Sequence, residues 1–320
     1  MELRYEDGWL LEMDADAGVY DVYDEKRCLL QQVTGNQRLL LSGKDKRPML
    51  YIRKDKQTFV VKPRALPDTG VVNFRDLGGY VNRDGQQVRY DCFYRSAPLC
   101  DLQKDHVDYL HQLHIQHILD LRSDMERKGK EDIHLREAKY HPISAITFDQ
   151  GMDVKGSFDF ATLLQQVDVT LLKNMMMQVY RKLPFDNPAY RLLVQVVLEE
   201  EVPVLFHCSA GKDRTGFGAA LLLLLLDVDE ETILNDYVLS NQYRKKENAK
   251  IYAQVTASQT DMEAVMGVQK QYLRAALQAI KQRYQTYEAY FQAEFGIDET
   301  QRKHLKQCFL YPLNLSLIHI

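Results

Sequence analysis

The sequence predicts an α/β protein with a central, mainly parallel sheet flanked by helices and preceded by a small β-sandwich-like unit. Three observations lead to this prediction. Short apolar runs alternate with turn residues over residues 1–66, as in antiparallel β-structure. Helical and strand-like segments then alternate, which is typical of a parallel sheet covered on both faces. Finally, a strand, a glycine-containing loop and a very apolar helix follow one another between residues 202 and 226.

Length and composition limit the possible classes of protein. The chain has 320 residues, enough for about two domains at ~150 residues each. Its 41 Lys and Arg against 45 Asp and Glu give no reason to expect nucleic acid as a partner. Five scattered cysteines without a Cys-x-x-Cys pair argue against a disulfide framework and favour a reducing compartment. Since the first residues show no apolar leader, we expect a cytoplasmic protein. The longest apolar run, Phe217 to Leu226, is too short for a transmembrane segment and predicts a fully buried helix.

The first 66 residues are predicted to form an all-β domain. Pro63 and Pro67 mark its boundary with a second domain over residues 67–313, and residues 314–320 form a separate apolar tail. The predicted strands are the runs at residues 9–11, 19–23, 39–41, 49–52 and 58–61.

The second domain is predicted to alternate helices with strands. The helices cover about 102–113 and 188–200, and each precedes a strand, at 115–120 and 203–206. Beyond residue 229 the pattern is helical, with one long helix that ends near Phe295 and Gly296 as its C-cap. Residues 144–158 are a candidate mobile loop. Met175, Met176 and Met177 are predicted to pack in the core, with a flexible apolar lid as the alternative.

One segment, Val202 to Gly216, carries most of the chemistry. It places Cys208 after a strand and Arg214 six positions later, at the start of the helix that contains six consecutive leucines. The spacing alone is weak, because five cysteines would produce one such pair by chance about a quarter of the time. The context makes it specific, since a loop at a helix N-terminus gathers backbone N–H groups into one concavity.

Such a loop suits a phosphoryl group. Arg214 offers a planar fork for two oxygens, Cys208 lies at the base as a thiolate nucleophile, and Thr215 donates its hydroxyl to the sulfur. His207 orients the loop, and Gly211 provides a left-handed backbone where the loop curls. The predicted phosphate-binding residues are Ser209, Ala210, Gly211, Lys212, Asp213, Arg214 and Arg122.

Several site residues keep two interpretations. Asp213 is either the helix N-cap or a general acid, because a carboxyl group beside a bound dianion is easier to protonate. Its rivals as the acid are Asp120, at the end of a strand, Asp149 and Asp153 in the candidate loop, and Asp159 directly after it. Lys212 is either a solvated lysine or a second positive charge for substrates with more than one phosphate.

Three further charged residues are assigned from their sequence neighbours. Arg122 either reaches the phosphate or forms a salt bridge with Glu126, while Arg75 and Asp76 are expected to fix the fold from inside. The histidines at 106, 111, 114 and 117 show no convincing metal cluster.

The stretch from His207 to Gly216 resembles the signature of cysteine-dependent tyrosine and dual-specificity phosphatases, especially the bacterial branch with His-Cys-x-x-Gly-Lys-Asp-Arg-Thr-Gly. The stretches 73–80, 93–99 and 118–126 support the same branch, so that the resemblance covers roughly residues 70–310. It implies a four- or five-stranded parallel sheet, a phosphocysteine intermediate and no metal or other cofactor. It also implies phosphorylated proteins, peptides or phosphoinositides as substrates.

Two other functions remain as alternatives. One is a pseudophosphatase that binds phosphorylated partners without turnover, although the intact Cys208, Arg214 and Thr215 argue against it. The other is a sulfurtransferase that carries a persulfide on Cys208, although the run from Lys212 to Thr215 fits phosphate better.

Overall fold

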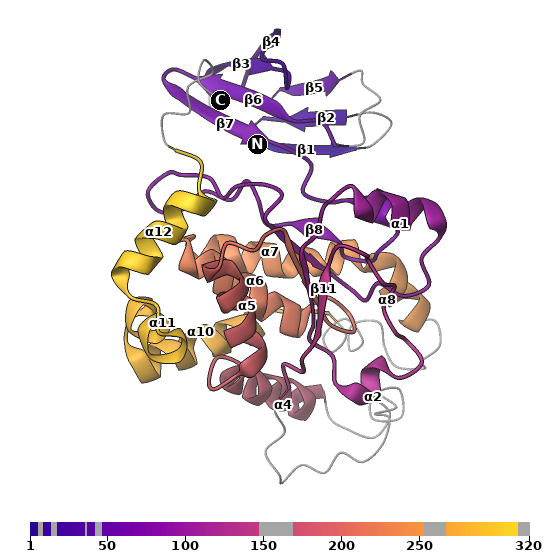
Figure 1. The fold of residues 1–320 in the computed structure, drawn as a ribbon. Coiled ribbons are helices and arrows are strands. Elements are labelled where there is room, and N and C mark those ends of the chain that lie inside the picture. The colour runs from indigo at the N-terminus through magenta and orange to yellow at the C-terminus, as the bar shows by residue number, and fades with distance from the viewer. Residues whose placement is uncertain are drawn as a thin grey trace.

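The structure is a computed structural model that describes residues 1–5, 9–13, 18–35, 37–41, 47–146, 169–252 and 267–312. The N-terminal part consists of two antiparallel sheets, which lie above the rest of the molecule in Figure 1. Their order is β1-β2-β5 in one and β4-β3-β6-β7 in the other. The strands are β1 (Glu2–Tyr5), β2 (Trp9–Glu12), β3 (Val19–Tyr23), β4 (Leu29–Thr34), β5 (Arg38–Leu41), β6 (Leu50–Lys54) and β7 (Gln57–Val61).

The two N-terminal sheets bury one common core. Buried side chains alternate along the strands, as in β3, where Tyr20 and Val22 point inward. They pack with Trp9 and Leu11 of the other sheet. The predicted β-sandwich-like unit is therefore confirmed, and its five predicted strands correspond to β2, β3, β5, β6 and β7. β1 and β4 were not predicted, because most of their residues are exposed and give no clear apolar pattern.

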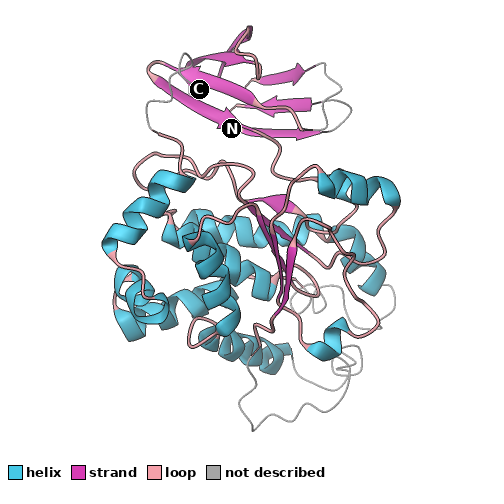
Figure 2. Cartoon of the chain, in the orientation of Figure 1, coloured by secondary structure: helices cyan, strands magenta, loops and turns pink. Residues whose placement is uncertain are grey.

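The second part is built on a five-stranded sheet, shown in magenta in Figure 2, with the order β11-β10-β12-β9-β8. Its strands are β8 (Arg75–Asp76), β9 (Phe93–Ser96), β10 (His117–Asp120), β11 (Lys139–Pro142) and β12 (Val204–His207). β9, β12, β10 and β11 are parallel to their neighbours, and only β8 runs antiparallel, against β9. This confirms the predicted fold class and places β12, which precedes the candidate loop, at the centre of the sheet.

Alternate residues of the strands feed two cores, one on each face of the sheet. Phe206 and Leu119 point to a large core with α5 (Pro188–Leu198) and α6 (Asp213–Leu225). Leu205 and Ile118 point to a smaller core that includes residues of α1 (Lys104–His111). Because both faces are covered, every residue of β9, β10 and β12 is buried, the polar ones at their ends included, whereas the edge strand β11 is largely exposed.

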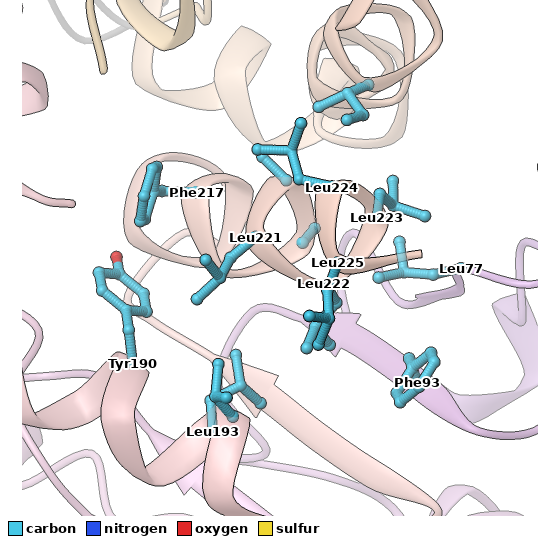
Figure 3. Packing of buried hydrophobic residues seen from close by; sticks show 14 of the residues in the cluster. Leu77, Phe93, Tyr190, Leu193, Phe217, Leu221, Leu222, Leu223, Leu224 and Leu225 are labelled. Atoms are coloured by element: carbon cyan, nitrogen blue, oxygen red, sulfur yellow. The ribbon is translucent and has the colours of Figure 1, made fainter. Parts of the chain in front are cut away.

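Helix α6 is the central element of the larger core. Its residues from Thr215 to Leu225 are all buried, which confirms the prediction of a fully buried helix. Figure 3 shows how its leucines meet neighbours on several sides: Leu222 lies near Phe93 of the sheet, and Leu221 lies near Tyr190 and Leu193 of α5. Close packing of α6 in the core therefore fixes the position of its N-terminus and of the loop that precedes it.

The C-terminal part is helical, as predicted, but the expected single long helix is wrong. It is divided into α10 (Lys270–Tyr284) and α11 (Tyr287–Phe295), because Gln285 has a left-handed backbone with φ of 67°. Gly296 caps α11 with φ of 70°, as predicted. The remaining helices are α2 (Asp124–Arg127), α4 (Val169–Lys182), α7 (Glu230–Tyr243), α8 (Lys245–Tyr252) and α12 (Glu299–Phe309). None of the helices in the described ranges is long and apolar enough to cross a bilayer.

The N-terminal part contacts the second part through an apolar cluster of Tyr51, Val60 and Tyr90 and through polar groups. Arg47 forms ion pairs with Asp76 and Asp91, and the side chain of Gln87 hydrogen-bonds both backbone groups of Val60. The proposed boundaries of the two domains remain a prediction, and the tail at 314–320 lies outside the described residues.

Candidate active site

The candidate loop runs from Cys208 to Lys212 and connects the end of β12 to the start of α6. Lys212 is the N-cap residue of α6, and Asp213 is its first helical residue. The interpretation of Asp213 as the N-cap is therefore wrong. The amides of Ser209 and Gly211 donate to no backbone carbonyl among the described residues. Together with the N-terminus of a 13-residue helix, these amides suit an anion.

Gly211 meets two requirements at once. Its φ is 65°, a left-handed conformation that side chains with a Cβ rarely adopt. A Cβ at this position would also lie 2.3 Å from the carbonyl oxygen of Ser96, at the end of β9. The loop can therefore curl against the neighbouring strand only with glycine here, as the sequence predicted for the backbone conformation.

A buried polar network holds the loop from behind. The carbonyl of Gly211 accepts hydrogen bonds from Asn73 at 2.7 Å and from Arg95 at 3.0 Å. Arg95 also pairs with Asp236 of α7 at 2.7 Å, and Arg75 pairs with the same carboxylate at 3.0 Å. All of these side chains are at most 3% exposed, so the network has no contact with bulk water.

The network supplies the partners of Arg75 and Asp76, two residues that were expected to stabilise the fold but whose partners the sequence did not indicate. Arg75 does fix the fold from inside, and Asp76 does so through Arg47 and the amides of Gly78 and Asp91. Burial opposes ionisation of Asp236, but the two guanidinium groups outweigh it and hold its pKa well below the usual range. Asp236 could not be predicted from the sequence, because one aspartate in a helix gives no sign of burial.

Cys208 lies at the base of the loop and is 1% exposed. Burial raises the pKa of its thiol, but Arg214 and hydrogen bonds from the Thr215 side chain and the amides of Thr215 and Ala210 outweigh this effect. The net result is a pKa below the ordinary value. The Thr215 hydroxyl contributes to this shift, but its oxygen is buried without a hydrogen-bond partner among the described residues. Its donation to the sulfur therefore stays a prediction.

Arg214 faces a carboxylate on the open side of the loop. Its two terminal nitrogens each lie 2.7 Å from an oxygen of Glu126, in a bidentate pair, and one of them also lies 3.3 Å from the hydroxyl of Ser209. This pair lowers the pKa of Glu126 to about 2, although burial opposes the shift. The expected salt bridge between Glu126 and Arg122 is therefore wrong, because Glu126 belongs to Arg214.

Arg122 does not reach the loop either. It is 1% exposed, and its guanidinium donates to Asp120, to Asp132 and to the carbonyl of Lys130. With every nitrogen engaged inside the protein, Arg122 is not available to bind phosphate, which corrects that prediction. Asp132 was not considered from the sequence.

Asp120 is equally unsuited to a general acid. It is fully buried, and Arg122 and the hydroxyl of Tyr140, at 2.6 Å, both hydrogen-bond its carboxylate. Burial opposes ionisation, but these partners and His207 outweigh it and lower the pKa of Asp120. A carboxylate held in the ionised form does not donate a proton, so Asp120 orients Arg122 and the strand end instead.

His207 supports the loop from within. Its Nε2 lies 2.7 Å from Asp132, and its Nδ1 lies 3.8 Å from Asp120. The three residues bring possible metal-ligand atoms within 4.8 Å of one another. Arg122 pairs with both aspartates, however, so a side chain of this chain already supplies the positive charge there. The role predicted for His207, orienting the loop, fits this position.

Asp213 is the candidate general acid that the structure brings to the loop. One of its carboxylate oxygens accepts a hydrogen bond from Tyr180 at 2.8 Å, and the other lies 3.7 Å from the ammonium group of Lys212. The side chain of Asp213 is 24% exposed, so a ligand in the loop can reach it. Asp149, Asp153 and Asp159 lie outside the described residues.

The methionine run of α4 divides between core and surface. Met176 and Met177 pack against the large core, as predicted, whereas Met175 is 40% exposed. Tyr180, on the same helix, is fully buried and contacts the loop through Asp213, a link that periodicity alone did not reveal.

Comparison with known proteins points in one direction. A family model described as "Tyrosine phosphatase family" matches residues 66–311. A protein of Cupriavidus necator, assigned by name to the tyrosine-protein phosphatases, is 28% identical over 72% of this chain and 84% of its own length. The triple specificity protein phosphatase PtpB of Mycobacterium tuberculosis is 29% identical over 77% of this chain and 99% of its own length.

A solved structure of TpbA from P. aeruginosa, in complex with phosphotyrosine, aligns with 59% of this chain and 94% of that one. The sequence identity is 16% and the TM-score is 0.27.

Proposed function

The chain belongs to the tyrosine phosphatase family and is a phosphoric monoester hydrolase, and from that premise we propose that it acts through a phosphocysteine intermediate on Cys208. The observation that carries the proposal is the setting of this thiol. It lies at the base of the loop, beside Arg214, with its pKa lowered in spite of burial. A thiol is ordinarily neutral, but beside Arg214 and the loop amides it ionises more easily. Cys208 can therefore act as a thiolate nucleophile at the position where the phosphoryl group binds.

In the first step the Cys208 thiolate attacks phosphorus, the S–P bond forms, and the bond to the leaving oxygen breaks. The loop amides and Arg214 hold the other phosphoryl oxygens. Asp213 gives its proton to the leaving oxygen, so that the product departs as a neutral alcohol or phenol. Glu126 holds the Arg214 fork in orientation, through the bidentate pair described above.

In the second step water attacks the phosphocysteine. The Asp213 carboxylate accepts a proton from that water, the S–P bond breaks, and inorganic phosphate leaves with Cys208 restored as a thiolate. Asp213 thus returns to its protonated state in each cycle, and atoms and charges balance.

Magnitudes indicate which group matters most for the rate. A free thiol is already a few per cent ionised at neutral pH, so complete ionisation raises the thiolate population only about thirtyfold. Each well-aligned donor to the transition-state oxygens contributes about 3 kcal/mol, or more than a hundredfold. The amides and Arg214 should therefore outweigh the activation of Cys208.

Phosphotyrosine in proteins or peptides is the substrate that the family favours, and we extend the proposal to phosphoinositides. Lys212 supports the extension, because its ammonium group lies beside Asp213 at the loop, where a second phosphate of one substrate could pair with it. The name of the M. tuberculosis relative, a triple specificity phosphatase, also favours more than one substrate class.

The direct test is Cys208→Ser. We expect turnover of phosphotyrosine peptides to fall to background, while inorganic phosphate still binds with nearly unchanged affinity, because the amides and Arg214 remain. A burst assay with p-nitrophenyl phosphate measures the first step, and isothermal titration measures phosphate binding. Near-normal turnover in this variant would refute the proposal. Profiling the unaltered enzyme against phosphopeptides, phosphoinositides and inositol phosphates then decides the extension, which fails if only phosphopeptides are hydrolysed.

The same assays separate the two alternatives. A pseudophosphatase would bind phosphate without a burst, and a sulfurtransferase would convert thiosulfate but not aryl phosphate.

A further inference from the structure

Asp213 is hydrogen-bonded to a pair of tyrosines outside the loop. The hydroxyl of Tyr180, on α4, donates to the Asp213 carboxylate at 2.8 Å. The hydroxyl of Tyr237, on α7, lies 2.5 Å from that of Tyr180. Because Tyr180 has one proton, which points to the carboxylate, the proton between the two tyrosines belongs to Tyr237. The result is a directed chain from Tyr237 through Tyr180 to Asp213.

The position of both tyrosines is fixed by packing. Tyr180 and Tyr237 are fully buried, and the ring of Tyr180 stacks on Tyr272 of α10 with centroids 5.9 Å apart. Gly216, which follows Thr215, allows Tyr237 to approach α6, since a Cβ there would lie 2.7 Å from the Tyr237 ring. The lack of a side chain at Gly216 therefore makes room for Tyr237, the outer donor of the hydrogen-bond chain to Asp213.

Both hydroxyls stay protonated under ordinary conditions. Burial raises the pKa of Tyr180 and Tyr237 well above the usual value, and the charge of Asp213 raises it further. The tyrosines therefore act as hydrogen-bond donors and not as bases. The other charged or titratable groups that face Asp213 from the described residues are Lys212, Arg214, Tyr190 and Tyr272.

We propose that Tyr180, supported by Tyr237, is a positioning residue that holds the Asp213 carboxyl toward the leaving oxygen and stabilises its ionised form. The inference rests on the role given to Asp213 in the proposed function. A hydrogen bond from an O–H donor favours the charged form of a carboxylate. Tyr180 thereby helps Asp213 to release its proton in the first step and to stay ionised until water needs a base.

The pH dependence of the first step tests this idea, because that step requires a protonated Asp213 and slows as Asp213 ionises. Without the Tyr180 hydroxyl, the ionised Asp213 carboxylate loses a hydrogen bond and is less stable relative to the protonated form. Asp213 therefore keeps its proton to higher pH. In a plot of burst rate against pH, we expect Tyr180→Phe to move the descending limb to higher pH by about one unit. Tyr237→Phe should move it in the same direction by less, because it supports the donor and does not touch the carboxylate.

Tyr190→Phe is the matched control. Its hydroxyl is equally buried next to the loop but donates to the backbone carbonyl of Arg214, at 2.9 Å. We expect this variant to leave the limb at its original pH. Thermal unfolding of each variant shows whether it folds; if Tyr180→Phe does not, the direction of the Tyr237→Phe shift decides.

Asp213→Asn distinguishes failure of the inference from failure of the proposed function. If this variant keeps the descending limb, the assignment of Asp213 as the acid is wrong. If Asp213→Asn removes the limb while neither tyrosine variant moves it, the role of Asp213 stands and the role of Tyr180 is refuted.

Discussion

The two sides of the loop at residues 208–212 hold arginine–carboxylate pairs of the same chemistry in opposite settings. Behind the loop, Asp236 pairs with Arg75 and Arg95, and none of these side chains is more than 2% exposed. On the open side, Glu126 pairs with Arg214, and their side chains are 32% and 12% exposed. The inner pairs belong to the scaffold, whereas the outer pair lies where a ligand of the loop can reach it.

Burial is what separates the two roles. Removing charges from water is costly, so a buried carboxylate is tolerated only with fixed partners, and losing one partner leaves a charge without compensation. A half-exposed pair loses less when it separates, because water or a ligand replaces the lost partner. Mutation of the inner charges should therefore mainly lower the free energy of unfolding, and mutation of the outer charges should mainly lower kcat/KM.

Asp236→Asn should have the largest effect on stability. It leaves Arg75 and Arg95 buried beside each other without their counter-charge, which we expect to lower the free energy of unfolding by about 3–5 kcal/mol in urea denaturation. Glu231→Gln, on the exposed side of α7, is the matched control, because that carboxylate pairs with Lys270 and Arg274 near the surface and with no other charged group in the described ranges. A difference between the two variants below about 1 kcal/mol would remove the distinction between inner and outer pairs.

The same carboxylate predicts how stability changes with acid. The pKa of Asp236 is depressed in the folded protein, so its contribution is present above the unfolded value of ~3.9 and is lost as pH falls toward the lower folded value. Acidification below about pH 4 should therefore destabilise the unaltered protein more steeply than Asp236→Asn. Parallel slopes in the two proteins would contradict this account.

Arg214→Ala should have the next largest effect, and in turnover. We expect kcat/KM to fall by about 10²–10³-fold, with weaker phosphate binding, because the fork that holds two phosphoryl oxygens is lost. The free energy of unfolding should fall by less than in Asp236→Asn. Arg191→Ala, at a half-exposed arginine paired with Asp186, provides the control and should leave kcat/KM unchanged. A loss in Arg214→Ala that appears in stability alone would contradict the comparison.

The same contrast shows how much of this site could be predicted from the sequence. Cys208, Gly211, Arg214 and Thr215 could be predicted to share one loop because the proposed loop chemistry is local, with all four residues within seven positions of one another. The strand, loop and helix around them follow from apolar pattern and glycine. Most predicted elements of the second domain lie within a few residues of the observed ones for the same reason.

The partners of those residues could not be predicted, because pairing is decided by topology. Glu126 was expected to pair with Arg122, four positions away, but β10 and β12 are neighbours in the sheet and bring Glu126 to Arg214 instead. Asp236 and Tyr180 lie on helices far from the loop in sequence, and neither has a local pattern that separates it from a surface residue. The break at Gln285, which divides one expected helix into two, could not be predicted, because the residue with the left-handed backbone there is a glutamine and not a glycine.

Glu126→Gln should have the smallest effect and tests the outer pair most finely. A glutamine keeps the hydrogen bond to the Ser123 amide that caps α2, so the helix should remain intact. It offers Arg214 one acceptor oxygen in place of two charged ones, and the fork loses its fixed orientation. We therefore expect kcat/KM to fall by about tenfold, equivalent to about 1.4 kcal/mol, with little change in unfolding. Asp124→Asn, on the same helix and almost fully exposed, should leave turnover unchanged. If Glu126→Gln instead raises turnover, the carboxylate competes with substrate for Arg214 and does not orient it.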